Sequence, residues 1–201
     1  VLAAQQQNVS SNIRITYSVD GVGAKVSAKY GSIKPTGEVT LANMTTGDGV
    51  TTELNFSVSD TNGGASLTPS GDIELTQTTG TEVVFEYRFE NTADTLFTIG
   101  MKSTGTAVNI AEYYYVSTEP LAANKYGKIA EPLLNGTATG ELVIPKQAIL
   151  STTNPGNVVY IYVKVAVANI NKSASYEKNY DWELKQLTTE QVPFDLSLNN
   201  G

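Results

Sequence analysis

The sequence predicts an all-β protein, an antiparallel jelly roll or β-sandwich of about ten strands with little helix. Apolar and polar residues alternate through several segments, and loops rich in glycine, asparagine, threonine and proline, such as STTNPGN, separate these segments. Side chains of an extended strand point alternately to opposite faces, so a period of two indicates a strand with one face in a core. The length of 201 residues suits one large β domain.

The clearest alternation lies in the segment VVFEYRFENTADTLFTIGM, residues 83–101. Apolar side chains occupy every second position before and after the turn-forming residues 91–94, which favours two neighbouring antiparallel strands joined by a turn. We expect the apolar set to form core and the intervening charged set to face water or another subunit. The apolar set is Phe85, Tyr87 and Phe89, and the charged set is Glu86, Arg88 and Glu90.

The other elements follow from the same pattern. Residues 12–30 predict a hairpin with its turn at Asp20-Gly21. Further strands are expected at 38–41, 53–59, 72–77, 112–117, 140–144, 158–170 and 180–186. Residues 121–130 and 145–150 are the candidates for short helical turns, and residues 145–150 fit a crossover between sheets equally well. Because the sequence has no internal repeat and no break in composition, we expect an extension at residues 1–11 and one β-sandwich domain at residues 12–201.

Composition excludes several classes of function. The chain has no histidine and no cysteine, which removes the common proton carrier of hydrolases and the usual ligands of transition metals. The 13 basic and 20 acidic residues give a net charge of −7, which argues against nucleic-acid binding. No apolar run reaches the roughly 20 residues of a membrane-spanning helix. We therefore expect a non-enzymatic protein without a membrane span.

Charged residues make up 16% of the chain, compared with about 25% in typical soluble domains, which favours an extracellular protein. The sequence begins at Val1 rather than methionine, so we expect a secreted protein whose signal peptide has been cleaved. The absence of cysteine predicts no disulfide framework.

Two short motifs have alternative explanations. The run from Asp60 through Asn62 to Gly64 offers oxygen ligands of the kind that calcium takes, but it lacks a closing glutamate and also fits a simple turn. The sequence therefore assigns no cofactor and leaves calcium as an alternative at Asp60 and Asn62. The triplet Tyr113-Tyr114-Tyr115 suggests carbohydrate stacking, but adjacent residues of a strand lie on both faces, so at least one tyrosine should pack in a core or interface.

Two segments resemble a known family. The segment FEYRFENTADTLFTIGM resembles the strand-turn-strand of the TasA and camelysin class of bacterial surface fibre proteins. The segment VVYIYVKVAVANI and the Asp-Trp-Glu-Leu strand after it are similar to the closing hairpin of that class. The resemblance implies a secreted bacterial or archaeal jelly-roll subunit that polymerises head to tail with copies of itself. Donor-strand complementation through the N-terminal segment would then build a pilus-like or biofilm-matrix filament.

Either end of the sequence offers residues for such a donor strand. The N-terminal set is Val1, Leu2, Ala3, Ala4 and Val9. The C-terminal set, which lies on one face of an extended segment, is Val192, Phe194, Leu196 and Leu198. The alternative function is a monomeric cell-surface adhesin or carbohydrate-binding module, and the third is an S-layer or capsid protein.

Overall fold

The computed structural model describes residues 7–17, 23–44, 54–56, 63–67, 73–75, 82–92, 97–105, 110–132, 141–144, 157–167 and 174–186. Within these ranges the chain forms thirteen strands, β1 to β13, and its helical part is one 3-10 turn, η1 (Tyr126–Lys128). The all-β class with little helix is therefore confirmed. No helix in these ranges is long and apolar enough to cross a membrane.

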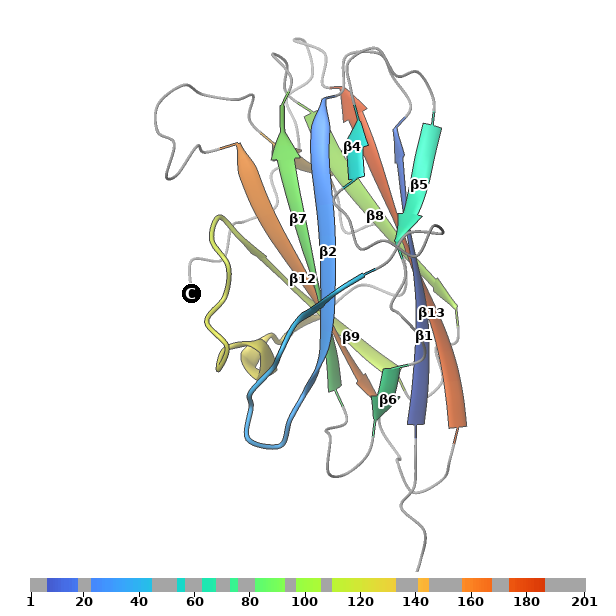
Figure 1. The fold of residues 1–201 in the computed structure, drawn as a ribbon, viewed down its shortest axis with the longest axis vertical. Helices are drawn as coiled ribbons and strands as arrows, with labels where there is room; N and C mark the ends of the chain where they lie inside the picture. Colours follow the sequence, from blue (N-terminus) through green and yellow to red (C-terminus); the bar gives the residue numbers. More distant parts are fainter. Residues whose placement is uncertain are drawn as a thin grey trace, which may run out of the picture.

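The strands form two sheets (Figure 1). Sheet A has the order β11 (Glu141–Ile144), β8 (Phe97–Gly105), β13 (Ala174–Gln186), β1 (Gln7–Tyr17) and β5 (Gly63–Leu67), and β6 (Ile73–Leu75) also pairs with β1. Sheet B has the order β10 (Glu131–Pro132), β9 (Ile110–Ser117), β12 (Val158–Val167), β7 (Glu82–Asn91), β2 (Ala24–Ile33) and β3 (Ala42–Asn43), and β4 (Leu54–Phe56) also pairs with β2.

Pairing is antiparallel throughout the described strands except between β1 and β13, which run parallel. The predicted antiparallel architecture is therefore correct apart from this pair. A parallel pair needs a long connection between its strands, and here the connection includes every other strand of both sheets.

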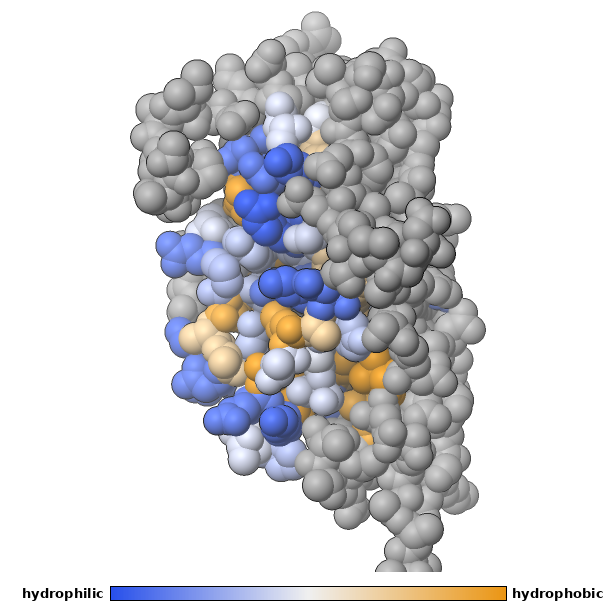
Figure 2. Space-filling model, viewed as in Figure 1, coloured by the Kyte–Doolittle hydropathy of each residue, from blue (hydrophilic) through white to orange (hydrophobic). Residues whose placement is uncertain are grey.

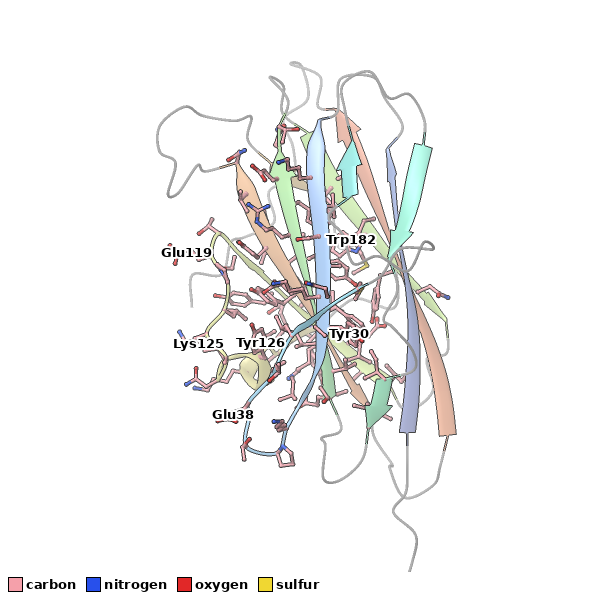
Figure 3. All side chains as sticks on the ribbon, in the orientation of Figure 1. Tyr30, Glu38, Glu119, Lys125, Tyr126 and Trp182 are labelled. Atoms are coloured by element: carbon pink, nitrogen blue, oxygen red, sulfur yellow. The ribbon has the colours of Figure 1, made fainter. Side chains whose placement is uncertain are left out.

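Aromatic side chains join the two sheets. Phe85, Tyr87 and Phe89 of β7 are fully buried, as the alternation predicts. Trp182 of β13 lies between the sheets (Figure 3), with its ring centroid 4.7 Å from that of Tyr87 and 5.2 Å from that of Phe89. The rings of Phe85 and Tyr180 lie 5.6 Å apart. Tilted aromatic pairs at these distances contribute beyond the area that they bury, so this cluster holds the sheets face to face.

The predicted hairpins are wrong. Strands β1 and β2 belong to different sheets, and the same is true of β7 with β8 and of β12 with β13. Each of these connections runs from one sheet to the other. Alternation fixes which side chains face the core, but both sheets of a two-layer fold present the same pattern to that core. Sequence neighbours therefore gave no reliable guide to pairing partners.

Some strand boundaries also differ from the prediction. Residues 38–41 are not a strand, and the short strand β3 follows them. Gly63 and Gly64, which we assigned to a turn, begin β5. The turn η1 falls within the predicted helical segment 121–130, whereas residues 145–150 lie outside the described residues.

Candidate functional site

The outer face of sheet B, which is turned away from sheet A, has a network of polar side chains. The register of β7 with β12 places Glu86 beside Tyr162 and Arg88 beside Tyr160. The hydroxyl of Tyr162 donates a 2.8 Å hydrogen bond to Glu86 Oε2. Arg88 Nε donates to the hydroxyl of Tyr160 at 3.3 Å, and Arg88 Nη1 lies 3.1 Å from Glu90 Oε2. The charged groups on this face therefore lie beside polar or oppositely charged partners.

Residues 118–130, which we call the cover segment, pack against this network. The amide of Leu121 donates to the hydroxyl of Tyr162 at 2.9 Å, and the ring of Tyr126 meets that of Tyr162 edge-on at 5.7 Å. Lys164 Nζ donates to the carbonyl oxygen of Gly127 at 3.0 Å. Figure 3 shows Tyr126 beside sheet B within this segment. Side chains of β12 thus fix the cover segment at three points.

The cover segment changes the environment of the polar residues beneath it. Glu86 is 8% exposed and Lys164 is 6% exposed. Lys164 also forms a 3.1 Å ion pair with Glu82. Burial, assisted by the charge of Glu86, raises the pKa of Tyr162 well above its usual range. The expectation that Glu86 faces water or another subunit is therefore wrong, because another part of the same chain covers it.

A second segment, residues 34–41, crosses the same face, and we call it the strap. Gly37 makes its turn with a φ of +88°. A Cβ atom on Gly31 of β2 would lie 2.6 Å from the carbonyl oxygen of Thr40. After the strap, Met44 is fully buried and its amide donates to Ala28 O at 3.1 Å. Glycine at position 31 is what lets the strap lie against the sheet.

The tyrosine triplet divides between the two faces, as predicted. Tyr113 and Tyr115 pack with the outer-face cluster, and Tyr114 packs against the core between the sheets. Lys164 Nζ lies 5.0 Å from the ring centroid of Tyr113, which is a cation–π distance. Figure 2 shows apolar patches on this side of the molecule separated by polar residues. The triplet therefore does not form one aromatic platform.

The second candidate site is the place of β1 within sheet A. One edge of β1 pairs with β13 in a continuous parallel register, from Gln7 opposite Ala174 to Tyr17 opposite Leu184. The other edge pairs with β6 over Gln7–Val9 and with β5 over Ile13–Tyr17. Residues 7–11, which we assigned to the extension, are thus continuous with this strand.

Of the residues proposed for assembly, Val9 lies in β1, opposite Tyr176 and Ile73. The other assembly residues and both calcium candidates lie outside the described residues. They are Val1, Leu2, Ala3, Ala4, Val192, Phe194, Leu196, Leu198, Asp60 and Asn62.

The sequence did not reveal the partners of Lys164 and Glu86. Each stands in an alternating strand as an ordinary outward residue, and nothing near Gly127 or Leu121 indicates a contact with β12. Within the described ranges, no group of three or more acidic side chains is placed to hold a metal ion. No protein-family model matches the chain, and no curated protein matches it.

Proposed function

We propose that this chain is a non-enzymatic, extracellular structural subunit that assembles into a pilus-like or biofilm-matrix filament. Copies of the chain would join by donating β1, or residues preceding it, to the next subunit. The observation that carries this proposal is the place of β1, which is inserted between β13 on one side and β5 and β6 on the other. Val9, one of the residues of the N-terminal donor set, lies in this strand.

The pairing of β1 explains why exchange would be stable. Without β1, the whole edge of β13 from Ala174 to Leu184 would lose its partner, and so would β5 and β6. Unpaired strand edges readily accept another strand. The next strand in the sequence, β2, lies in the other sheet, and residues 18–23 alone connect it to β1. A second copy can therefore fill the same position without changing the pairing of β2.

Two further observations support a structural role, and a third concerns the fold. The outer-face network of sheet B binds the cover segment through Tyr162 and Lys164, so its polar groups serve packing contacts. Histidine and cysteine are absent from the sequence. The repeated crossing of consecutive strands between two sheets is compatible with a jelly roll, which we propose as the finer description of the fold.

The absence of cysteine allows a direct test by disulfide trapping. Asn12 of β1 lies opposite Asn179 of β13, and neighbouring strands are close enough for a disulfide bond. We would mix N12C protein with N179C protein under assembly conditions and oxidise the mixture. Strand exchange predicts disulfide-linked heterodimers within filaments, because the two cysteines meet only when β1 of one copy joins β13 of another.

Controls separate exchange from incidental contact. The double variant N12C/N179C should form linked ladders in filaments and an internal disulfide in isolated monomers. N12C mixed with K102C should give no linkage, since Lys102 lies opposite Asp181 on the far side of β13. Filaments in which N12C and N179C never link, although the double variant forms its internal bond, would reject donation by β1.

A carbohydrate-binding module is the second candidate, favoured by the half-exposed rings of Tyr113, Tyr115 and Tyr160 on the outer face of sheet B. Aromatic rings with polar groups beside them suit sugar faces, and Arg88 lies beside Tyr160. A glycan array tests this function. Y160A should abolish retention on a bound glycan, and binding that survives Y160A would remove this face from consideration.

A further inference from the structure

Three candidate glycosylation triplets begin on strands that the structure describes. The sequence contains five Asn-x-Ser/Thr triplets without proline at the middle position, the acceptor pattern of N-linked glycosylation in secreted proteins. Two of them begin outside the described residues, at Asn135 and Asn171. The other three begin at Asn8 in β1, Asn43 in β3 and Asn55 in β4. Because so short a motif also occurs by chance, its position in the fold decides which asparagine can carry a glycan.

Asn43 is exposed to solvent on the terminal strand of sheet B. The next residue, Met44, is fully buried in the core between the sheets, and its amide donates to Ala28 O at 3.1 Å. Adjacent residues of an extended chain point to opposite sides. The core contact of Met44 therefore turns Asn43 outward, to the side of its register partner Lys29 in β2. A glycan on Asn43 would extend into solvent and leave the core packing unchanged.

The other two described triplets begin in different surroundings. Asn8 lies inside sheet A, opposite Ser175 of β13 on one side and Glu74 of β6 on the other. Asn55 lies in β4, which pairs with β2 on the same side as β3 does. Asn43 is thus the acceptor for which the structure shows both an exposed asparagine and a place at the end of a sheet.

We propose that Asn43 carries an N-linked glycan in the secreted protein. The donor would be an oligosaccharide linked through phosphate to a lipid carrier. Transfer forms a bond from Asn43 Nδ2 to C1 of the first sugar and breaks the bond between C1 and the phosphate oxygen. The lipid phosphate leaves with the bonding electrons, and the amide nitrogen loses one proton. This inference rests on the extracellular location in the proposed function, and it does not require filament formation.

The glycan would also shield one edge of sheet B. Exposed strand edges readily pair with other chains, and proteins protect them with charged residues, proline or a covering group. At the opposite end of sheet B, the terminal strand β10 consists of Glu131 and Pro132 and so has both a charge and a proline. The terminal strand β3 consists of Ala42 and Asn43 and has neither. A bulky, hydrophilic glycan on Asn43 would supply the missing protection.

Peptide mass mapping of the native protein, purified from the medium of the cells that secrete it, tests the proposal. A glutamate-specific protease releases residues 39–53, which contain Asn43 as their only triplet asparagine, separately from residues 54–74, which contain Asn55. The peptide 39–53 should carry the added mass of one or more sugars, and fragmentation should place that mass on Asn43. Recovery of this peptide at its unmodified mass alone would overturn the proposal.

Variants expressed in the same cells separate this modification from others. N43Q and T45A should both lose the added mass, and T45S should keep it, because serine also completes the triplet. Added mass that survives in N43Q would belong to another residue and would also overturn the proposal. Purified T45A should aggregate faster than T45S in light scattering, and equal rates would reject the shielding of β3.

Electron microscopy of the same samples keeps this test apart from that of the proposed function. Filaments whose peptide 39–53 is unmodified would reject the glycan alone. A glycosylated protein that forms no filaments would reject the filament alone.

Discussion

Substitution of Gly31 by alanine should loosen the strap from the outer face of sheet B. The new Cβ would lie 2.6 Å from Thr40 O and 2.9 Å from Val39 Cγ1, whereas ordinary contact begins at 3.4 Å. The strap backbone must therefore retreat by about 0.8 Å. Because the obstructing atom at Thr40 belongs to the main chain, rotation of a side chain cannot relieve the clash.

Overpacking of this kind costs about 1–3 kcal/mol. For a chain of this size, each kcal/mol lowers the Tm by about 2–4 °C. Urea denaturation and thermal unfolding of G31A measure the loss. Hydrogen exchange localises it, because the amide of Met44, which bonds Ala28 O beyond the strap, should exchange faster in G31A than in the wild type.

Gly100→Ala provides the matched control. Gly100 lies in β8, and a Cβ built there meets nothing within 4 Å. Alanine at this position should be neutral or stabilise by about 0.4–1 kcal/mol, because it restricts the unfolded chain. If G31A and G100A have equal stability, and Met44 is equally protected in both, the close approach of the strap to Gly31 is wrong.

Four further predictions concern the core and the buried polar groups. Phe85→Ala should destabilise the protein by about 3–5 kcal/mol in urea denaturation. Glu86→Ala should destabilise it by about 1–3 kcal/mol, because the substitution leaves the hydroxyl of Tyr162 without its acceptor. An effect of E86A near zero would contradict the buried hydrogen bond between Tyr162 and Glu86. Lys164→Met should increase hydrogen exchange across the cover segment while β7 stays protected, and uniform protection would show that the lysine does not hold that segment. Burial raises the pKa of Tyr180, so above about pH 10 the tyrosine keeps its proton in the folded protein and loses it on unfolding. The free energy of unfolding should therefore fall above that pH by about 1.4 kcal/mol per pH unit from this residue. Y180F should reduce that slope when stability is measured as a function of alkaline pH.

The sequence predicted the orientation of side chains far better than the partners of strands. Phe85 and Tyr87 face the core as their alternation indicates, because a period of two is a local property of an extended chain. Whether β7 pairs with β8 depends on contacts between distant segments, and here β7 pairs with β2 and β12 instead. Such pairing leaves no mark in the intervening turn.

The candidate sites also depend on contacts between segments that are distant in the sequence. The burial of Glu86 depends on Leu121 and its neighbours, more than thirty residues away, and the sequence near Glu86 is that of an ordinary exposed position. The glycines that begin β5 carry turn propensity, so the strand that completes the pairing of β1 was missed. The local preference of Gly63 and Gly64 for a turn is weaker than the pairing of β5 with β1 in the assembled sheet.

The parallel pairing of β1 with β13 also sets a delay during synthesis. Gln7 pairs with Ala174, about 170 residues later in the chain. At 5–20 residues per second, β1 leaves the ribosome roughly 10 to 30 s before its partner is made. Sheet A cannot close around β1 during that interval, and closing so long a loop further slows the final step. Throughout this time the edge of β1 that will pair with β13 is open, and a chaperone or a second chain can engage it first.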